Sequence, residues 1–399
     1  MTDLTLFEGG TLIVVALDHY QGDALAESGV VDAVRLGGGE WAVSATTKVG
    51  VATIGDLTIW IRPKVEIARL LFLLGYARNP GWREDTVAMA AVDDLVPALA
   101  EAFAEQTERA LERGVLQGYA EIDDSLTVLR GRLREHDQLR QRFGIAVPLL
   151  VRFDEHTVDI AENQLLRGAA EILLRLPRVP AGVRTRLRHL RLVLADVTPP
   201  PRGAPLPAWQ PHRLNERYHV ALWLADLILR GNAVDAAPGG LRVGGFLVDM
   251  AKVYEDFLTT ALDEALIPHG GWTVAQDRQL FDVGGDVEIR PDLVWYLDGQ
   301  PAAVVDAKYK VEKPAGFPNA DLYQMLAYCT TLELPEGHLV YAKGNAESAT
   351  HEVRHAGVTI HTHTLDLAEA PPALLGQVDR LAQRVAGTAP VALRAGALT

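Results

Sequence analysis

The first 65 residues carry short apolar runs interrupted by glycine, a pattern typical of β-strands joined by tight turns. The run Gly37-Gly38-Gly39 predicts a turn, and Gly55-Asp56 predicts a hairpin connection. Strands are expected at residues 11–17, 40–43, 49–54 and 57–61. The pattern therefore indicates a small β-rich module, and a β-barrel without a special role also fits it.

Between residues 67 and 230 the apolar positions recur at helical spacing, with charged residues between them. Helices are expected at residues 68–77, 87–113, 127–142, 161–176, 184–194 and 215–229, and a strand-like segment at 147–153. Residues 198–211 hold five prolines between Pro199 and Pro207, which predicts a stiff, extended connector. This part of the chain is therefore predicted to be mainly helical.

A break rich in glycine and alanine at residues 231–245 precedes a different order of elements, so the main domain boundary is placed there. A long helix is expected at 246–266, then strands at 278–283, 287–289, 293–297 and 302–307, a helix at 320–332, strands at 337–342 and 357–362, and a helix at 372–387. Three parts follow from these patterns. They are a β-rich module at 1–85, a mainly helical region at 86–235 and a third domain at 240–399.

The composition is that of a globular protein, with 48% hydrophobic and 23% charged residues among 399. The net charge of −14 argues against a protein that coats nucleic acid by bulk attraction. The single cysteine, Cys329, excludes an internal disulfide and a cysteine-based zinc site. Neither a signal peptide nor an apolar run of about 18 residues is found, so we expect a soluble, cytoplasmic protein without a membrane span.

Two aspartates stand at the ends of a predicted hairpin. Asp292 opens one strand in Arg290-Pro291-Asp292, and Asp306 closes the next, fourteen positions later. The two ends of such a hairpin meet, and Lys308 shares a face with Asp306 because strand residues two apart point the same way. Residues 286–310 are therefore predicted to form a site with two carboxylates and a lysine.

Hydrolysis of a phosphodiester requires groups of this kind. Asp292, Asp306 and the main-chain carbonyl of Ala307 offer hard oxygen ligands for Mg²⁺, with Mn²⁺ as the alternative ion. A bound metal neutralises charge on the phosphate and activates its water, and Lys308 can orient or deprotonate that water. The pattern predicts the metal-binding hairpin of a DNA nuclease of the PD-(D/E)xK type. The alternative is a surface hairpin with incidental charges.

Three flanking residues extend this prediction. Nucleases of this type often present a glutamate from the helix before the strands, and Glu255 has that place here. Gln324 and Tyr328 lie four apart on one predicted helical face, an arrangement that recurs beside the active site of RecB-like members of the superfamily. An exposed helix glutamate and an ordinary amphipathic helix are the alternatives.

Taken over its whole length, the chain resembles the McrC family, the nuclease subunits of McrBC-type modification-dependent restriction systems. The matching segments are 61–65, 70–77, 129–133, 159–166, 246–258, 290–292, 306–310 and 321–328. The resemblance implies an α+β multidomain protein, with an N-terminal β-rich module and a central helical region. It also implies a C-terminal α/β domain of the restriction-endonuclease-like PD-(D/E)xK fold, in which helices flank a mixed sheet.

The resemblance also implies partners. McrC-like proteins work with McrB, an AAA+ GTPase that forms a hexameric ring. The N-terminal region of McrC inserts into that ring and stimulates its GTP hydrolysis. The expected partners are therefore an McrB-like GTPase or ATPase ring and double-stranded DNA. The sequence G-x-x-x-x-G-K-[ST] is absent, so no nucleotide is expected to bind this chain in a P-loop. Cutting both strands needs two sites, so nuclease domains are expected to pair at least transiently.

Several basic residues are candidates for binding DNA or the partner. Arg62 and Lys64 follow an expected strand, and Arg130, Arg132 and Arg134 form a central cluster. One hypothesis is that these side chains contact DNA phosphates or an acidic face of the partner ring. Solvated or internally paired side chains are an equally weighted alternative.

Two other functions stay open at this stage. The chain could act mainly as an activator and adaptor of its NTPase, with a nuclease fold that clamps DNA and cuts little. It could also be a stand-alone repair nuclease of the RecB type, as Gln324 and Tyr328 suggest. The leading hypothesis is a Mg²⁺-dependent DNA endonuclease subunit that an AAA+ ring activates.

Overall fold

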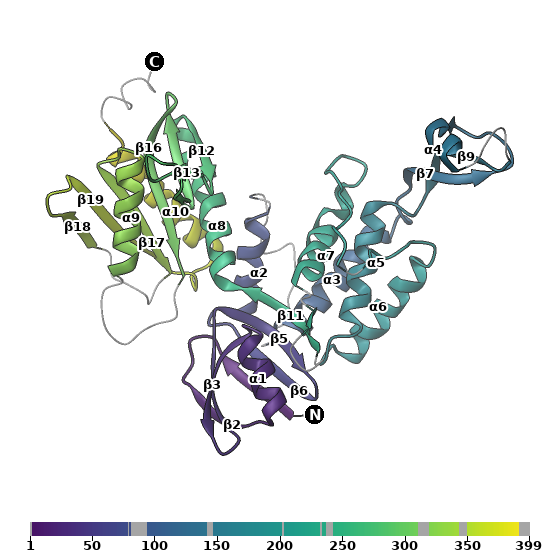
Figure 1. Ribbon diagram of the computed structural model, residues 1–399, viewed down its shortest axis with the longest axis horizontal. Helices are drawn as coiled ribbons and strands as arrows, with labels where there is room; N and C mark the ends of the chain where they lie inside the picture. Colours follow the sequence, from purple (N-terminus) through teal and green to yellow (C-terminus); the bar gives the residue numbers. More distant parts are fainter. Residues whose placement is uncertain are drawn as a thin grey trace. The chain divides into compact units, whose positions relative to one another are not determined.

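The computed structural model describes residues 2–78, 80, 94–141, 147–201, 203–231, 234–236, 242–309, 319–342 and 349–390. Its contacts divide the chain into two units (Figure 1). The first unit combines Met1–Leu95 with Ala233–Thr399, and the second is Val96–Asn232. This grouping does not separate residues 1–85 from 240–399, so the three-part division stays a prediction.

A five-stranded sheet in the first unit joins N-terminal strands to two strands from residues 234–249. Its order is β1-β6-β5-β11-β10, with β1 (Thr2–Phe7), β5 (Lys48–Ile54), β6 (Leu57–Arg62), β10 (Val234–Ala236) and β11 (Arg242–Asp249). Strands β5 and β6 form the hairpin expected around Gly55-Asp56. The antiparallel pairing of β11 with β5 brings residues from the expected domain boundary into the N-terminal sheet.

The pairing of β5 with β11 depends on two glycines. A Cβ atom at Gly50 would lie 2.1 Å from the carbonyl oxygen of Phe246, and one at Gly245 would lie 2.1 Å from that of Val51. The expectation of a helix from residue 246 is therefore wrong at its start, because Phe246 is buried in β11 and the helix begins at Met250. Short apolar runs suit a buried strand and a helix equally, and only the partner strand decides between them.

A second, three-stranded sheet lies in the same N-terminal region. Its order is β2-β4-β3, with β2 (Ile13–Ala16), β3 (Val31–Gly37) and β4 (Glu40–Ala45). The helix α1 (His19–Glu27) was not expected from the sequence, although Asp18 and Gln21 form a capping box at its start. The module is thus β-rich, as expected, with one additional helix.

The C-terminal part of the first unit is built on a six-stranded mixed sheet. Its order is β12-β15-β16-β17-β19-β18, with parallel pairs β16–β17 and β17–β19 and antiparallel pairs elsewhere. The strands are β12 (Trp272–Ala275), β15 (Leu293–Leu297), β16 (Gln300–Lys308), β17 (Glu336–Ala342), β18 (Ala349–Val353) and β19 (Val358–Leu365). A small ladder, β13 (Gln279–Leu280) with β14 (Glu288–Ile289), replaces the longer strand expected at 278–283.

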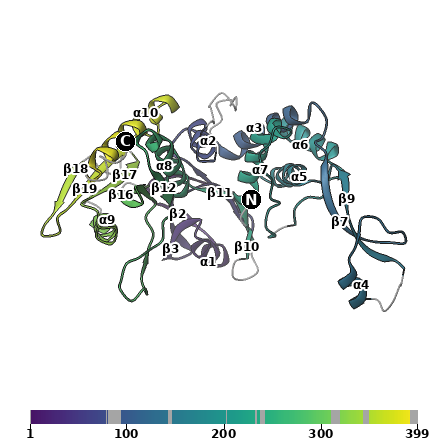
Figure 2. The same ribbon diagram turned by 90° about the horizontal axis from the view of Figure 1, so that it is seen from above.

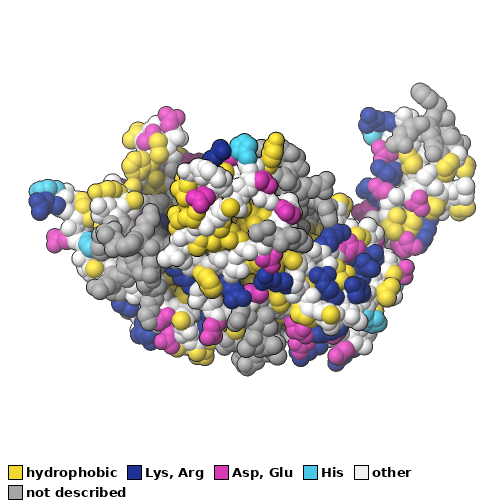
Figure 3. All heavy atoms as spheres, turned by 90° about the horizontal axis from the view of Figure 1, so that it is seen from below, with side chains coloured by type: hydrophobic (Ala, Val, Ile, Leu, Met, Phe, Trp, Pro, Cys, Tyr) yellow, Lys and Arg dark blue, Asp and Glu magenta, His cyan; other side chains and the backbone are white. Residues whose placement is uncertain are grey.

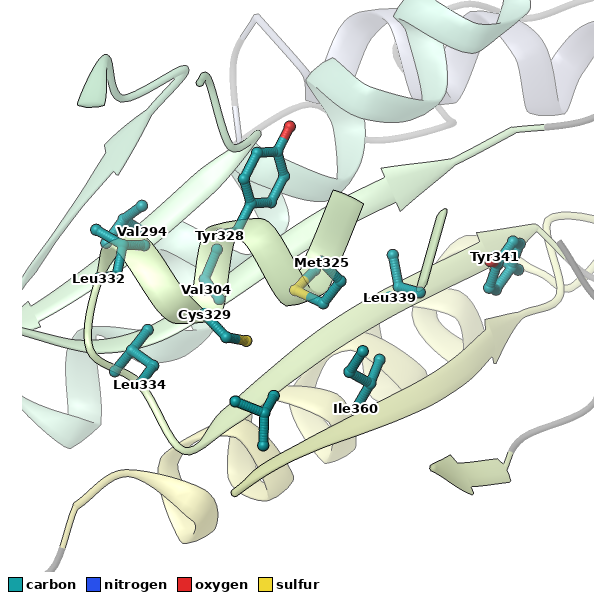
Figure 4. Close-up of a cluster of buried hydrophobic side chains, with 11 residues drawn as sticks. Val294, Val304, Met325, Tyr328, Cys329, Leu332, Leu334, Leu339, Tyr341 and Ile360 are labelled. Carbon is teal, nitrogen blue, oxygen red and sulfur yellow. The ribbon is translucent and has the colours of Figure 1, made fainter. Parts of the chain in front are cut away.

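Helices cover both faces of this sheet (Figure 2). The helix α9 (Asn319–Thr331) packs on one face, where Met325 and Cys329 join a core with Leu339 and Tyr341 (Figure 4). The helices α8 (Met250–Leu266) and α10 (Pro371–Thr388) pack together on the other face. The turn η4 (Ile267–His269) follows α8 and leads into β12. The helix α2 (Ile67–Tyr76) packs against α8, since the Phe72 and Phe257 ring centroids are 6.1 Å apart.

The second unit is a group of helices with a three-stranded sheet. The helices are α3 (Leu95–Leu111), α4 (Glu135–Gln141), α5 (Ala161–Leu173), α6 (Ala181–Val193), α7 (His219–Gly231) and the turn η2 (Glu216–Tyr218); the strands are β7 (Gly118–Leu126), β8 (Arg132–Leu133) and β9 (Leu149–Thr157). Of the expected helix at 87–113, residues 87–93 lie outside the described residues. No helix in the described parts of the chain is long and apolar enough to cross a membrane.

The helix expected at 127–142 is wrong for its first half. The chain forms β7 and β8 before the short helix α4, and residue 142 lies outside the described part. Gly131 has a φ of 70°, and a Cβ there would lie 2.2 Å from the carbonyl oxygen of Arg152 on β9. Gly131 thus packs closely against a strand that is distant in sequence, and this contact prevents a helix there. The local spacing of apolar residues cannot predict such a contact.

Candidate active site

Asp292 and Asp306 come together at one end of the hairpin formed by β15 and β16. The antiparallel register pairs Leu293 with Val305, so the two aspartates lie directly beyond that pair. Oδ2 of Asp292 accepts a hydrogen bond of 2.8 Å from the main-chain nitrogen of Ala307. The structure thus places the acids where the spacing of the two strands predicts them.

Lys308 and Gln324 complete this end of the hairpin. Asp306 is only 2% exposed, and its Oδ2 forms a close ion pair with Nζ of Lys308 but no hydrogen bond of regular geometry. The same Nζ donates a 2.7 Å hydrogen bond to Oε1 of Gln324 on α9. The ammonium group is therefore held between a buried carboxylate and a side-chain amide.

Glu255 is connected to Asp292 through Gln276, a residue that the sequence analysis did not identify. Nε2 of Gln276 donates to Oε1 of Glu255 at 2.6 Å and to Oδ1 of Asp292 at 2.8 Å. Gln276 has a φ of 53°, and its main-chain nitrogen donates to the carbonyl oxygen of Asp292 at 2.9 Å. No motif marks Gln276; only its position directly after β12, the neighbour of β15, could have indicated it.

Tyr328 lies beside the site but does not contact its carboxylates. It is 4% exposed, and its hydroxyl donates to the main-chain oxygen of Arg290 at 3.3 Å. Burial raises the pKa of its hydroxyl, and the charges of Asp306 and Asp292 add to that shift. The tyrosine therefore supports the segment that leads into Asp292.

Asp321 is a second buried acid that the sequence did not single out. It is 6% exposed on α9, and its Oδ2 accepts a 2.8 Å hydrogen bond from the hydroxyl of Tyr341 on β17. Its charge contributes to raising the pKa of Asp306. Its position three residues before Gln324, one helical turn away, could have indicated it.

The carboxyl groups of the site bind protons more tightly than free carboxyl groups do. Burial raises the pKa of Asp292 to about 6, with a further contribution from Asp306. Burial also raises the pKa of Asp306, against the lowering effect of Lys308, and it raises that of Glu255. Carboxylates buried side by side favour a cation between them. The electrostatics of the site therefore fit a metal ion.

The oxygen atoms of the site also suit a hard divalent cation. Asp292, Asp306 and the carbonyl of Ala307 are the ligand types that Mg²⁺ prefers. Within the described ranges, however, no three His, Cys, Asp or Glu side chains are grouped closely enough to hold a metal. The amide of Gln276 lies between the carboxylates of Glu255 and Asp292 and donates to both.

The burial of Asp292 predicts a stability effect. A pKa that is higher in the folded chain, about 6 against about 3.9 in an unfolded one, makes the folded state lose stability as pH rises between these values. Asp292→Asn is therefore expected to raise the melting temperature at pH 8 in metal-free buffer, by about 1–2 °C per kcal/mol gained for a chain of 399 residues. The difference from wild type should shrink towards pH 4. Thermal unfolding followed by circular dichroism measures it.

The exposed Asp286 in the same domain provides the control for this prediction. Asp286→Asn removes the same charge from solvent and should leave the melting temperature nearly unchanged at both pH values. An Asp292→Asn protein that is less stable than wild type at pH 8 would show that its carboxylate stabilises the metal-free fold.

The candidate basic residues are partly paired within the chain. Nε of Arg62 donates to Oδ1 of Asp94 at 2.9 Å, whereas Lys64 is exposed. Arg130 lies over the ring of Phe153, with 4.0 Å from Cζ to the centroid. Other arginines of the region also have acidic partners, namely Arg134 with Asp123 and Asp137, and Arg186 with Glu101 and Glu108.

On the face drawn in Figure 3, basic side chains lie among acidic ones and do not form one continuous basic band. Arg132 is exposed on β8, like Lys64 after β6. For Arg62, Arg130 and Arg134, the structure thus agrees with the alternative that these side chains interact with other residues of the same chain. A role of Lys64 and Arg132 in binding DNA or a partner remains a prediction.

Comparison with known proteins places the chain in a family. Residues 43–342 match the family described as McrBC 5-methylcytosine restriction system component. No curated protein matches. The fold is similar to a chain of the refined half-complex from the tetradecameric assembly of Thermococcus gammatolerans McrB AAA+ hexamers with bound McrC. That match has a TM-score of 0.60 and 18% identity over 96% of this chain and 100% of the other.

A second solved structure, the cryo-EM structure of the Thermococcus gammatolerans McrBC complex, matches with a TM-score of 0.42 and 21% identity. It covers 66% of this chain and 88% of the other. The family match extends over about three quarters of the sequence and includes both acids of the hairpin and Lys308. The chain belongs to the McrBC family of 5-methylcytosine restriction system components.

Proposed function

We propose that this chain is the Mg²⁺-dependent DNA endonuclease subunit of an McrBC-like restriction system. The observation that carries the proposal is the pairing of the buried Asp306 with the half-buried Asp292, with the ammonium of Lys308 beside Asp306. A structural hairpin has no need of two desolvated carboxyl groups, because their burial costs free energy that a salt bridge recovers only in part. A site that binds a metal and a phosphate gains from the same arrangement.

Each residue of the site has a place in this chemistry. Asp292, Asp306 and the carbonyl of Ala307 would hold Mg²⁺, or Mn²⁺ in its place. When bound, the ion supplies charge neutralisation at the phosphate and a more acidic water. Lys308 orients the attacking water or stabilises the charge that develops on the phosphate, and Gln324 keeps its ammonium group in place. Gln276 fixes Glu255 relative to Asp292.

The architecture around the site supports the PD-(D/E)xK fold for the C-terminal part. Asp292 directly precedes β15, and Asp306 and Lys308 lie at the end of β16, the antiparallel neighbour of β15. The helices α8 and α9 bring Glu255 and Gln324 to the same end of these two strands. The side chains of Gln276, Glu255 and Gln324 therefore come together beside the two aspartates and Lys308. This convergence is what a catalytic site on that fold requires.

The proposed partner is an McrB-like AAA+ ring that hydrolyses GTP or ATP. Its support is the family match and the fold similarity to a structure that contains McrB AAA+ hexamers with bound McrC. The chain has no P-loop sequence of its own, so nucleotide hydrolysis would belong to the ring. The two activities, motor and nuclease, would therefore reside in two chains, with double-stranded DNA as the shared substrate.

Cleavage in a reconstituted system tests the proposal. The full chain, mixed with an McrB-like AAA+ protein, GTP or ATP, and methylated plasmid, is expected to cut both DNA strands when Mg²⁺ is present. Excess EDTA should abolish cutting, and Mn²⁺ should restore it. Gel electrophoresis of the plasmid measures the result.

Other outcomes identify the other functions. Stimulation of the NTPase without any cleavage in Mg²⁺ or Mn²⁺ would assign the chain to an activator role. Cleavage that is equally fast without an NTPase would favour a stand-alone nuclease. The full chain is needed in every assay, because a fragment that ends near residue 235 lacks β11 and leaves an edge of β5 unpaired.

A further inference from the structure

A buried acid lies in the N-terminal region, outside the proposed active site. Glu8 follows β1 and is only 3% exposed. Its main-chain nitrogen donates to the carbonyl oxygen of Arg62 at 2.9 Å, and its Oε2 accepts a 3.1 Å hydrogen bond from the main-chain nitrogen of Lys64. Its Oε1 is buried and has no hydrogen-bond partner in the described part of the chain. The carboxyl group is therefore deeply buried; burial raises its pKa, and the positive charge of Lys64 offsets only part of that increase.

The other side-chain partner of Glu8 is Tyr309, the residue directly after Lys308. The Tyr309 hydroxyl forms a hydrogen bond with the Glu8 carboxyl. Burial is the largest cause of a raised pKa at both groups, and the nearby charge of Asp249 adds to that shift at Glu8. The hydrogen bond thus lies in a dry environment, where it is stronger than in water.

Neighbouring residues of an extended strand point to opposite faces. Lys308 turns towards α9, where it donates to Gln324. Tyr309 turns the other way, and its ring centroid lies 5.9 Å from that of Tyr254 on α8. The Tyr309 side chain therefore anchors the end of β16 from the face opposite to the lysine.

This anchor links two sheets that are far apart in the sequence. Glu8 directly follows β1 of the five-stranded N-terminal sheet, and Tyr309 directly follows β16 of the six-stranded sheet. A second connection runs in parallel, because Oδ1 of Asp249 accepts hydrogen bonds from Oγ1 of Thr47 and from the main-chain nitrogen of Ala251, at the start of α8. The N-terminal sheet thus contacts both elements that carry Lys308 and Glu255.

We infer that Glu8 and Tyr309 are positioning residues, which hold the end of β16 so that Lys308 stays between Asp306 and Gln324. The inference rests on the proposed nuclease function. It makes the N-terminal sheet a structural part of the active site, so a protein that binds and displaces the end of β1 would also shift the catalytic lysine. A misplacement of a catalytic group by about 1 Å can lower a rate by roughly 100-fold.

Two substitutions of the link and one conservative variant test the inference. Tyr309→Phe removes only the hydroxyl, and Glu8→Leu removes the acceptor. Both are expected to lower the single-turnover cleavage rate of the full chain with its NTPase ring by about 10-fold or more. The Kd for DNA and the stimulation of the NTPase should remain those of wild type. Glu8→Gln keeps a carboxamide oxygen that accepts from the same donors, and should cut within about twofold of the wild-type rate.

Tyr254→Phe is the matched control. Tyr254 is buried next to Tyr309, and its hydroxyl donates to the carbonyl oxygen of Val340 on β17 at 3.3 Å rather than to Glu8. Its loss removes an equivalent buried hydroxyl and should leave cleavage unchanged. A drop as large as that of Tyr309→Phe would assign the effect to general packing and overturn the inference.

The failure of the inference and the failure of the proposed function can be distinguished. If Tyr309→Phe and Glu8→Leu cut at the wild-type rate while Lys308→Met does not, the positioning role is wrong and the nuclease site stands. If Lys308→Met also cuts at the wild-type rate, the proposed active site is wrong. Loss of cleavage in Glu8→Gln as severe as in Glu8→Leu would also contradict the inference, because the hydrogen bond is retained.

Discussion

Asp306→Asn is expected to lower DNA cleavage by about 100- to 1,000-fold, which is the effect of removing one group that stabilises charge in a transition state. The substitution keeps the shape of the side chain but removes the negative charge that would hold the metal. Asp306 is only 2% exposed. Cleavage of methylated plasmid in the presence of the NTPase ring measures the loss.

The same hairpin offers a matched control for this variant. Asp298 lies in the turn at the other end of the hairpin, with a φ of 49°, which asparagine also tolerates. Asp298→Asn should cut DNA as wild type does. Stimulation of the NTPase by Asp306→Asn should also be normal, since the substitution leaves the N-terminal sheet intact. Normal cleavage by Asp306→Asn would remove the acid pair from the mechanism.

Lys308→Met is expected to lower the single-turnover cleavage rate by about 100- to 10,000-fold, the usual contribution of a positioned acid or base. Methionine retains the apolar stem of the side chain but lacks the ammonium that contacts Asp306 and Gln324. The buried carboxylate of Asp306 then has no cation beside it. Its affinity for a proton should increase, and the residual cleavage should shift to higher pH.

Lys308→Arg separates charge from geometry at this position. Arginine keeps a positive charge beside Asp306, but its planar guanidinium cannot place a single donor where the ammonium lies. A partial recovery of cleavage relative to Lys308→Met would indicate that charge neutralisation is the main role of the lysine. No recovery would indicate that the position of the ammonium relative to the water decides the rate. A wild-type rate in Lys308→Met would contradict both.

The hairpin of the candidate site follows from local sequence. Asp292 and Asp306 lie next to strands that pair with each other across a tight turn, so their proximity depends on register and spacing alone. Lys308 shares a face with Asp306 because alternation along a strand is local as well. The sequence by itself therefore determined these three positions. The helical spacing of Gln324 and Tyr328 was informative in the same way, although only Gln324 contacts Lys308.

Other parts of the molecule were decided only by the tertiary structure. Strand β11 belongs to the N-terminal sheet because β5 offers it an edge and two glycines allow the close approach, which no periodicity within residues 242–249 reports. Gln276 joins Glu255 to Asp292 from a left-handed backbone position that has no motif.

The contact of Glu8 with Tyr309 connects residues roughly 300 positions apart, and the burial that raises the carboxyl pKa values depends on atoms from many segments. Local patterns record which face of an element is apolar. They do not record which distant element covers that face, and desolvation, which favours a cation at Asp292 and Asp306, arises only once the covering elements are in place.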